Sequence, residues 1–452
     1  MQKTALNIAA ALALATFGAG TAFAQSSLTL YGNADVSVDH VKKTAGVPLV
    51  GGVYAGPTKL AAQTGQYRAL TQGKDSSVTR VSPSGSSQTS FGLKGEENLG
   101  DGYKASFVLE GQLAHDTGAL GQDGRIFGRQ SYVGLTTPFG EVRLGRQYAP
   151  IFYSTAFVTG ERFGATDLFV EGGATNNLMV RQDNQISYWL KAGGFTGSVA
   201  YSPNAGSYST ITPSRNPSAF LGANGSGIES TGKLGRSIGF FGNYAFDSAL
   251  NTTFGYHRNE FDGAKFGTSV TVPGTPPTVT QVLSTADLDT YQAYNLGVKY
   301  VMPSNGILLD AAFGQGRYDV NGSAGGDNLK IQFVAAGIRV PVNQWTFSGQ
   351  VSQIKFKNFT KGKDTGLMLG AEYALSKRTT LYARAVQIRD DEGQESNAAG
   401  FTPGGGATVS VVGGPDVIAT ALGLRETPVF AGANINPGGK ATYIGAGVRH
   451  SF

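Results

Sequence analysis

The sequence contains no cysteine and only four histidines among its 452 residues. A disulfide framework and a thiolate metal site are therefore excluded. The histidines (His40, His115, His257 and His450) are scattered along the chain and do not show the spacing of a metal-binding motif. We therefore expect no metal ion in this protein.

Charged residues are also scarce, at 15% of the chain against about 25% in ordinary soluble proteins. The formal net charge is only +5, and the basic residues are scattered rather than gathered in patches, which argues against a nucleic-acid partner. Glycine, in contrast, accounts for 66 residues, and aromatic residues make up 10%. A chain of this composition is either low in complexity or built from β-strands, and its periodicity decides between the two.

Long apolar runs are missing from most of the chain, because the uncharged stretches 267–286 and 396–415 are interrupted by proline and glycine. The exception is the start, where Lys3 is followed by an uncharged run that ends in Ala22-Phe23-Ala24. This pattern predicts a cleavable secretory signal over residues 1–24, with the mature chain beginning at Gln25. The alternative is an uncleaved N-terminal membrane helix.

Apolar and polar residues alternate over many short segments. In residues 28–38, for example, Leu28, Leu30, Val36 and Val38 share one face, and mostly polar residues occupy the other. Residues 103–113 and 345–352 repeat the pattern. A period of two is typical of half-buried β-strands, but a soluble β-sandwich would give the same local signal.

The connections between these segments separate the two possibilities. We predict sixteen strands, at 28–38, 88–96, 103–113, 127–136, 141–147, 184–191, 195–202, 236–246, 249–259, 291–302, 307–318, 329–341, 344–356, 365–375, 379–390 and 440–452. Turns of two to five residues alternate with longer connections, the longest at 39–87, 148–183, 203–235, 260–290 and 391–439. Strict alternation of short turns and long loops predicts an all-β, antiparallel, up-and-down transmembrane barrel with periplasmic turns and extracellular loops.

Such a barrel leaves no unpaired strand edge in lipid, and an even strand count places both termini on the periplasmic side. The count is sixteen, or eighteen if residues 407–412 and 417–422 pair as an extra hairpin inside the last loop. Residues 25–452 then form a single barrel domain.

Five short stretches, taken in their order along the chain, carry a resemblance to a known family. They are SLTLYG at 27–32, FGLKGEENLG at 91–100, the segment 133–147, the segment 181–188 and GVRHSF at 447–452. These stretches resemble the Gram-negative general porins, especially those of betaproteobacteria. The resemblance implies an outer-membrane homotrimer that passes small hydrophilic solutes and ions by passive diffusion. It also implies contacts with outer-membrane lipid and lipopolysaccharide, and a third loop that folds into the lumen.

The same resemblance implies a constriction, where basic residues on the wall oppose acidic residues on the third loop. Strand parity places Lys94, Arg143 and Arg181 on the lumen face, and the family match adds Arg129. The acidic candidates in the third loop are Glu161, Asp167 and Glu171, which are otherwise ordinary solvated loop charges. One position departs from the family: Ser90 stands where relatives often carry arginine, so one basic group is missing. We expect a modest preference for anions.

The chain ends in Phe452, on the same strand face as Ile444, Ala446 and Val448. In the family, a terminal aromatic residue is read by the machinery that assembles outer-membrane barrels. We therefore expect Phe452 to be an assembly signal.

Three other functions are the alternatives to a general porin. An enzyme is disfavoured because no Gly-x-Ser-x-Gly motif, phosphate-binding loop or dinucleotide fingerprint is present, and therefore no cofactor is expected. A substrate-specific channel, with eighteen strands, would favour a track of inward-facing aromatic residues, of which only Tyr31, Trp189 and Phe241 stand out. An adhesin-like, non-conducting barrel would use the long loops 39–87 and 391–439 to bind a partner.

The predicted topology can be tested on intact cells. A single cysteine placed in the loop 391–439 should react with a membrane-impermeant thiol reagent, because this loop is expected to be extracellular and the native chain has no competing thiol. The protein should also run as a heat-modifiable trimer in mild detergent. An assembled trimer that resists labelling would refute the topology.

Overall fold

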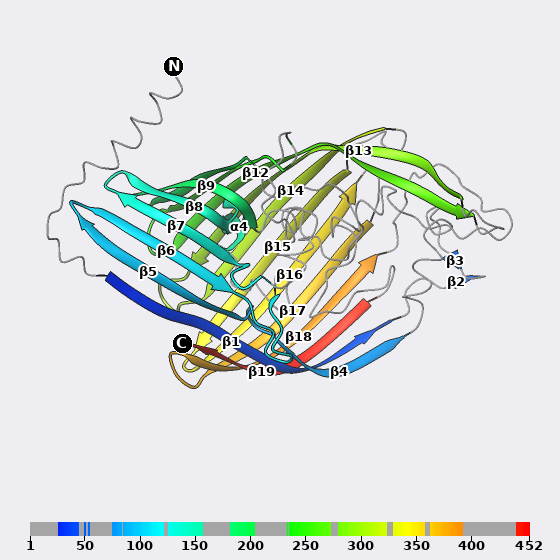
Figure 1. The fold of residues 1–452 in the computed structure, drawn as a ribbon. Helices are drawn as coiled ribbons and strands as arrows, with labels where there is room; N and C mark the ends of the chain where they lie inside the picture. Colours follow the sequence, from blue (N-terminus) through cyan, green and yellow to red (C-terminus); the bar gives the residue numbers. More distant parts are fainter. Residues whose placement is uncertain are drawn as a thin grey trace, which may run out of the picture.

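In the computed structural model, the described part of the chain forms one large antiparallel sheet that closes into a barrel (Figure 1). The structure describes residues 26–44, 49–50, 53–54, 75–83, 85–121, 125–156, 181–203, 233, 235–272, 279–322, 329–357, 362–391 and 440–452. The first strand, β1 (Ser26–Lys43), pairs with the last, β19 (Lys440–Ser451), from Asn33↔Ser451 to Lys43↔Ala441. This seam closes the sheet.

The remaining strands follow one another around the barrel in chain order. They are β4 (Ser76–Pro83), β5 (Ser90–Gly100), β6 (Tyr103–Gly111), β7 (Gln130–Thr137), β8 (Gly140–Tyr148), β9 (Arg181–Ala192), β10 (Phe195–Ser202), β11 (Ser237–Ala245), β12 (Leu250–Val272), β13 (Val279–Val301), β14 (Leu308–Gly322), β15 (Leu329–Val342), β16 (Trp345–Lys357), β17 (Gly362–Ala374) and β18 (Thr379–Asp391). Two very short strands, β2 (Leu49–Val50) and β3 (Val53–Tyr54), pair separately.

The seventeen strands of the main sheet occupy sixteen positions in the barrel, because β4 and β5 share one. Both pair with β1: β4 along its second half, Val36–Lys43, and β5 along its first half, Ser26–Asn33. The predicted sixteen-stranded, up-and-down barrel is thus confirmed. The predicted limits of its second strand, 88–96, are wrong, since β4 lies within the segment assigned to the first loop.

The prediction of a loop at 260–290 is also wrong in part. Strands β12 and β13 continue as a hairpin whose pairing runs from Ala264↔Leu288 to Val272↔Val279. The sequence shows no clear alternation there. Apolar and polar residues alternate where one face of a strand meets lipid and the other meets the lumen. Beyond the lipid-embedded part of the barrel, backbone hydrogen bonds alone can extend a hairpin, so its sequence does not have to alternate.

The side chains reverse the usual distribution of a soluble protein. Apolar side chains on the outer face are exposed, including Leu28 at 70% and Val133 at 63%. Polar side chains on the inner face, such as Asp35, Gln185 and Asn295, are buried. Aromatic residues gather near the short turns on the outer face, where Trp345 packs against Phe347 and Tyr373, and Tyr244 against Phe246. An apolar outer band with an aromatic girdle is the surface of a lipid-embedded barrel.

The short helix α4 (Pro150–Ala156) begins the connection between β8 and β9 and lies inside the barrel (Figure 1). It packs against β10 to β13, and Ile151 is fully buried. The hydroxyl of Thr253 donates to the carbonyl of Ser154 at 2.6 Å, and Gly255 leaves room for the helix because a Cβ there would lie 2.5 Å from the Ser154 hydroxyl. The start of the third loop is thereby fixed to the lumen wall. No described helix is long and apolar enough to cross a membrane.

The last residue completes the seam. The backbone of Phe452 exchanges two hydrogen bonds of 3.1 Å with Gly32 of β1. Its ring lies over the Cα of Gly32, so that a Cβ at this position would collide with ring carbons. A glycine at residue 32 is therefore required for the C-terminal ring to lie against the outer wall.

This packing predicts a stability difference between two glycine substitutions. Gly32→Ala should displace the Phe452 ring and lower the barrel's stability by about 1–3 kcal/mol, the usual cost of overpacking. Gly349→Ala is the matched control, because a Cβ there meets its nearest atoms at 3.6 Å or more. The temperature at which the folded band converts to the unfolded band in detergent gels measures the effect. Equal conversion temperatures for the two variants would contradict the close packing of the Phe452 ring on Gly32.

Candidate functional site

Arg129 lies just before β7 with its guanidinium buried against the inner wall. Its Nε donates to Glu110 on β6, its Nη1 to Oε1 of Gln88 at 2.6 Å, and its Nη2 to the hydroxyl of Tyr148 at 2.8 Å. Glu110 in turn accepts a hydrogen bond of 2.9 Å from the Tyr31 hydroxyl. The guanidinium is held by side chains from β6, from β8 and from the segment before β5, and its charge is paired with a carboxylate.

Arg181 opens β9 directly opposite Tyr148, the last residue of β8. Its Nη2 donates to the Tyr148 hydroxyl at 3.0 Å, and its guanidinium lies 4.6 Å from the centre of the tyrosine ring. A hydroxyl oxygen has two lone pairs, so Tyr148 accepts from Arg181 and Arg129 together. Two of the four predicted basic residues therefore meet at one oxygen atom.

Arg143 on β8 lies between aromatic rings, 4.8 Å from the ring centre of Trp189 and 5.1 Å from that of Tyr132. Its Nη2 donates to Glu141 at 2.7 Å. The two aromatic rings and the carboxylate hold the guanidinium at the lumen wall.

Lys94 on β5 is the most exposed of the four and lies opposite Thr29 of β1. Its Nζ is 5.3 Å from the ring centre of Tyr31, whose hydroxyl reaches the Glu110–Arg129 pair. The four predicted basic residues thus lie on one continuous part of the wall, from β5 to β9. Glu161, Asp167 and Glu171 lie outside the described residues.

Aromatic side chains pack around α4 on this wall. The ring of Tyr148 stacks on Phe152 at 4.5 Å, and Tyr153 contacts Trp189 at 4.9 Å and Phe241 at 5.8 Å, centre to centre. Burial raises the pKa of Tyr153 above its ordinary value, so its hydroxyl stays neutral. These rings join the helix to the basic wall.

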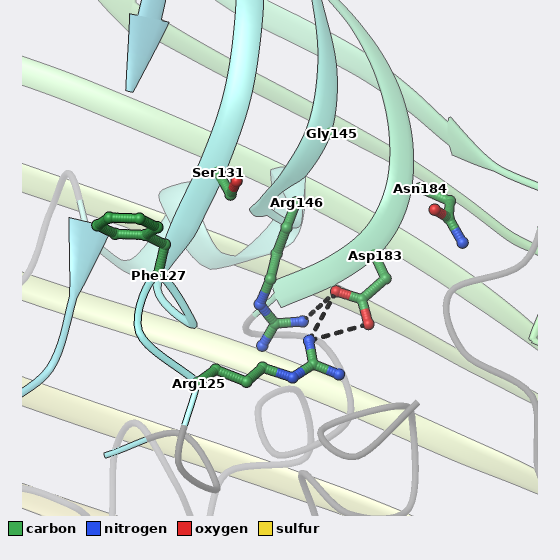
Figure 2. Close-up of a pocket in the computed structure, with 7 residues that line it drawn as sticks. All are labelled: Arg125, Phe127, Ser131, Gly145, Arg146, Asp183 and Asn184. Carbon is green, nitrogen blue, oxygen red and sulfur yellow. Dashed lines mark hydrogen bonds and ion pairs between the residues drawn. The ribbon is translucent and has the colours of Figure 1, made fainter. Parts of the chain in front are cut away.

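A second anchor holds the other end of the third loop. Figure 2 shows Arg125 and Arg146 converging on the carboxylate of Asp183, two residues into β9. Arg146 Nη1 donates to Oδ1 of Asp183 at 2.5 Å, and Arg125 Nη1 lies 3.1 Å from both carboxylate oxygens. Asn184 follows with a positive φ of 53°, where β9 slips in register against β8. This clamp sets the position of Arg181 at the start of the strand.

Sequence reasoning did not identify Glu110, Glu141, Gln88 or Tyr148 as site residues. Alternation does place Glu110 on the lumen face of its strand, since its neighbour Leu109 is on the outer face. No local signal pairs it with Arg129, which lies just before the next strand, β7. Within the described residues, no group of three or more His, Asp or Glu side chains could hold a metal ion.

The family model for Gram-negative porins matches residues 9–393. Among curated proteins, outer membrane porin protein 32 of Delftia acidovorans is 27% identical over 98% of this chain and 99% of its own length. Major outer membrane protein P.IA of Neisseria meningitidis serogroup C is 26% identical over 82% of this chain and 94% of its own length.

Among solved structures, the anion-selective porin from Comamonas acidovorans superimposes with a TM-score of 0.59 at 23% identity, over 95% of this chain and all of that one. OmpT of Vibrio cholerae, in its trimer form, gives a TM-score of 0.54 at 12% identity, over 94% of this chain and 99% of that one. At these identities the likeness concerns the fold.

The Glu110–Arg129 pair should contribute measurably to stability. In a double-mutant cycle with Glu110→Gln and Arg129→Gln, we expect a coupling energy of about 2 kcal/mol, because each single substitution leaves a buried partner. The exposed pair Glu96–Lys104, at 2.8 Å, is the matched control and should give about 0.5 kcal/mol or less. Urea unfolding of the barrel in lipid vesicles measures both cycles. Equal coupling energies would show that Arg129 is not held as described.

Proposed function

This chain belongs to the Gram-negative porin family, and from that premise we propose that it is a modestly anion-selective diffusion channel of the outer membrane. Small hydrophilic solutes and ions pass through the barrel passively, without an enzymatic step. The observation that carries the anion preference is the meeting of Arg129 and Arg181 at the Tyr148 hydroxyl, with Arg143 and Lys94 on the same wall.

The balance of charge on this wall supports the sign of the preference. Of the four basic groups, Arg129 is paired with Glu110 and Arg143 with Glu141. Two carboxylates therefore face four cations among these residues. In a narrow lumen with low-dielectric walls, such an excess raises the local concentration of anions. We propose that Glu161, Asp167 and Glu171 of the third loop oppose this wall and moderate the preference.

The proposal extends to assembly. We infer that residues 1–24 are a secretory signal, that the mature chain forms a homotrimer in contact with outer-membrane lipid and lipopolysaccharide, and that Phe452 is recognised by the barrel assembly machinery. The trimer form of the structurally similar OmpT supports the oligomer. The outward-facing, half-exposed ring of Phe452 supports its role as a recognition element.

A substrate-specific channel and a non-conducting, adhesin-like barrel are the competing functions. Five inner aromatic residues cluster around α4, where they pack the start of the third loop against the wall: Tyr148, Phe152, Tyr153, Trp189 and Phe241. This clustering supports a packing role for them rather than a track along the channel axis. Ohmic conductance without saturation by any one solute would support the general diffusion channel, whereas a silent barrel would support the adhesin.

Reversal potentials across a planar bilayer in a salt gradient test the selectivity. The native channel should favour anions, more strongly at low salt where screening is weakest. Arg129→Ala should lower the preference, because it removes a cation and leaves the Glu110 carboxylate uncompensated. Glu161→Gln should raise it.

Arg378→Ala is the matched control, because it removes an arginine from the exposed turn between β17 and β18, outside the constriction. It should leave the reversal potential unchanged. A cation-selective native channel, or an Arg129→Ala channel with native selectivity, would show that the constriction is placed wrongly.

A further inference from the structure

Residues 85–89 interrupt the wall between β4 and β5 and are bound by a lumen-facing carboxylate of β1. Asp35 accepts backbone N–H groups from Gly85 at 3.1 Å, Ser86 at 3.0 Å and Ser87 at 2.7 Å. The Tyr382 hydroxyl of β18 also donates to Asp35, which is fully buried. One carboxylate thus fixes the backbone of the whole turn on the inner wall.

The close fit of this segment requires glycine at residue 85. A Cβ there would collide with the Tyr382 hydroxyl and lie 2.6 Å from the hydroxyl of Ser37. The segment therefore packs directly on the inner faces of β1 and β18, next to the barrel seam.

The Ser86 hydroxyl accepts hydrogen bonds from two arginines on the other side of the seam. Arg449 of β19 donates from Nη1 to the Ser86 hydroxyl at 2.7 Å. Arg384 of β18 donates from Nη2 to the same hydroxyl at 3.2 Å and from Nη1 to the Ser86 carbonyl at 3.4 Å.

These two arginines belong to a group of three around Glu372 of β17. The carboxylate lies 3.2 Å from Arg384, 3.4 Å from Arg449 and 3.3 Å from Arg339 of β15. The Arg384 side chain is buried, while those of Arg339 and Arg449 are about one quarter exposed, at 25% and 26%. The guanidinium groups of Arg339 and Arg449 can therefore contact a solute near the short-turn end of the barrel.

Residues 85–89 also contact a second group of arginines, Arg129 and Arg181, which meet at the Tyr148 hydroxyl. Gln88 accepts from Arg129 at 2.6 Å, and Asn33 of β1 holds the Gln88 carbonyl at 3.2 Å. Residues 85–89 thus lie between Arg129, which shares Tyr148 with Arg181, and the group around Glu372.

We propose that residues 85–89 join these two groups into one arginine belt, consisting of Arg129, Arg181, Arg339, Arg384 and Arg449. In this belt, Arg339 and Arg449 form a second site for small anions, nearer the short-turn end than Arg129, and the buried Arg384 and Ser86 position it. Guanidinium forks match the oxygens of carboxylates and phosphates, so small oxyanions are the ligands of this site. The proposal rests on the proposed channel function and adds to it a selectivity element separate from the third loop.

Three variants in the bilayer assay separate charge from positioning. Arg449→Gln should lower the anion-to-cation permeability ratio by about twofold, and Glu372→Gln should raise it by a similar factor, because each changes one charge at close range. Ser86→Ala changes no charge but removes the hydroxyl that positions both arginines, and should also lower the ratio.

Ser198→Ala is the matched control for Ser86→Ala. Ser198 is buried on β10, on the face opposite the exposed Val199, and its hydroxyl has no hydrogen-bond partner in the described part of the chain. It should keep the native ratio. If Arg449→Gln and Glu372→Gln both conduct with native selectivity, the belt is refuted. If only Ser86→Ala is without effect, the positioning role of the segment is refuted.

A second measurement does not require conduction. Thr380 lies directly opposite Arg449 on β18 and shares its face, and the chain has no native cysteine. In Thr380→Cys, the thiolate attacks a methanethiosulfonate reagent, forms a mixed disulfide and releases methanesulfinate. The rate with a negatively charged reagent, divided by the rate with a positively charged one, reports the local potential.

Relative to a free thiol in solution, we expect this rate ratio to be raised about threefold in the otherwise native protein and to fall when Arg449→Gln is added. A ratio equal to that of the free thiol, or one that Arg449→Gln leaves unchanged, would overturn the proposal. A silent barrel that still shows the raised ratio would refute the channel function while supporting the anion site.

Discussion

Pairing every backbone hydrogen-bonding group within hydrocarbon is the constraint on which this structure depends, since each unpaired group there costs several kcal/mol. The chain meets it by closing β1 against β19, with Phe452 and Gly32 completing the ladder at the seam. Closure also creates the lumen, and polar side chains that a soluble protein would place outside are directed inward. The glycine at residue 32 follows from the same constraint, because the terminal ring needs space on the outer wall.

Once the charged side chains are inside, they are paired with one another. Arg129 with Glu110, Arg143 with Glu141, and the three arginines around Glu372 each reduce the cost of holding charge at a low-dielectric wall. In the proposed channel, anion selectivity then comes from the excess of basic over acidic side chains rather than from isolated charges. Tyr148 and Ser86 have the same structural role, because the hydroxyl oxygen of each accepts hydrogen bonds from two guanidinium groups.

The wall is also where the fold departs from a regular barrel. The break between β4 and β5 gives up part of one strand, and Asp35 compensates the freed backbone N–H groups. At the third loop, α4 at one end and the Asp183 clamp at the other fix the two attachments to the wall. Both irregular segments lie next to arginines, so they shape the surface that a solute meets.

The sequence by itself determined the up-and-down barrel and the inward direction of Lys94 and Arg143, and it left the strand count at sixteen or eighteen. Alternation and turn length are properties of single strands and their immediate connections, and the bilayer imposes them locally. Only the tertiary structure decided the strand β4, the long hairpin of β12 and β13, and the partners of each charge. Arg384 and Ser86 lie 298 positions apart, and they meet because the barrel closes and its strands adopt one register. Closure and register depend on all strands at once, and for that reason no local pattern contains them.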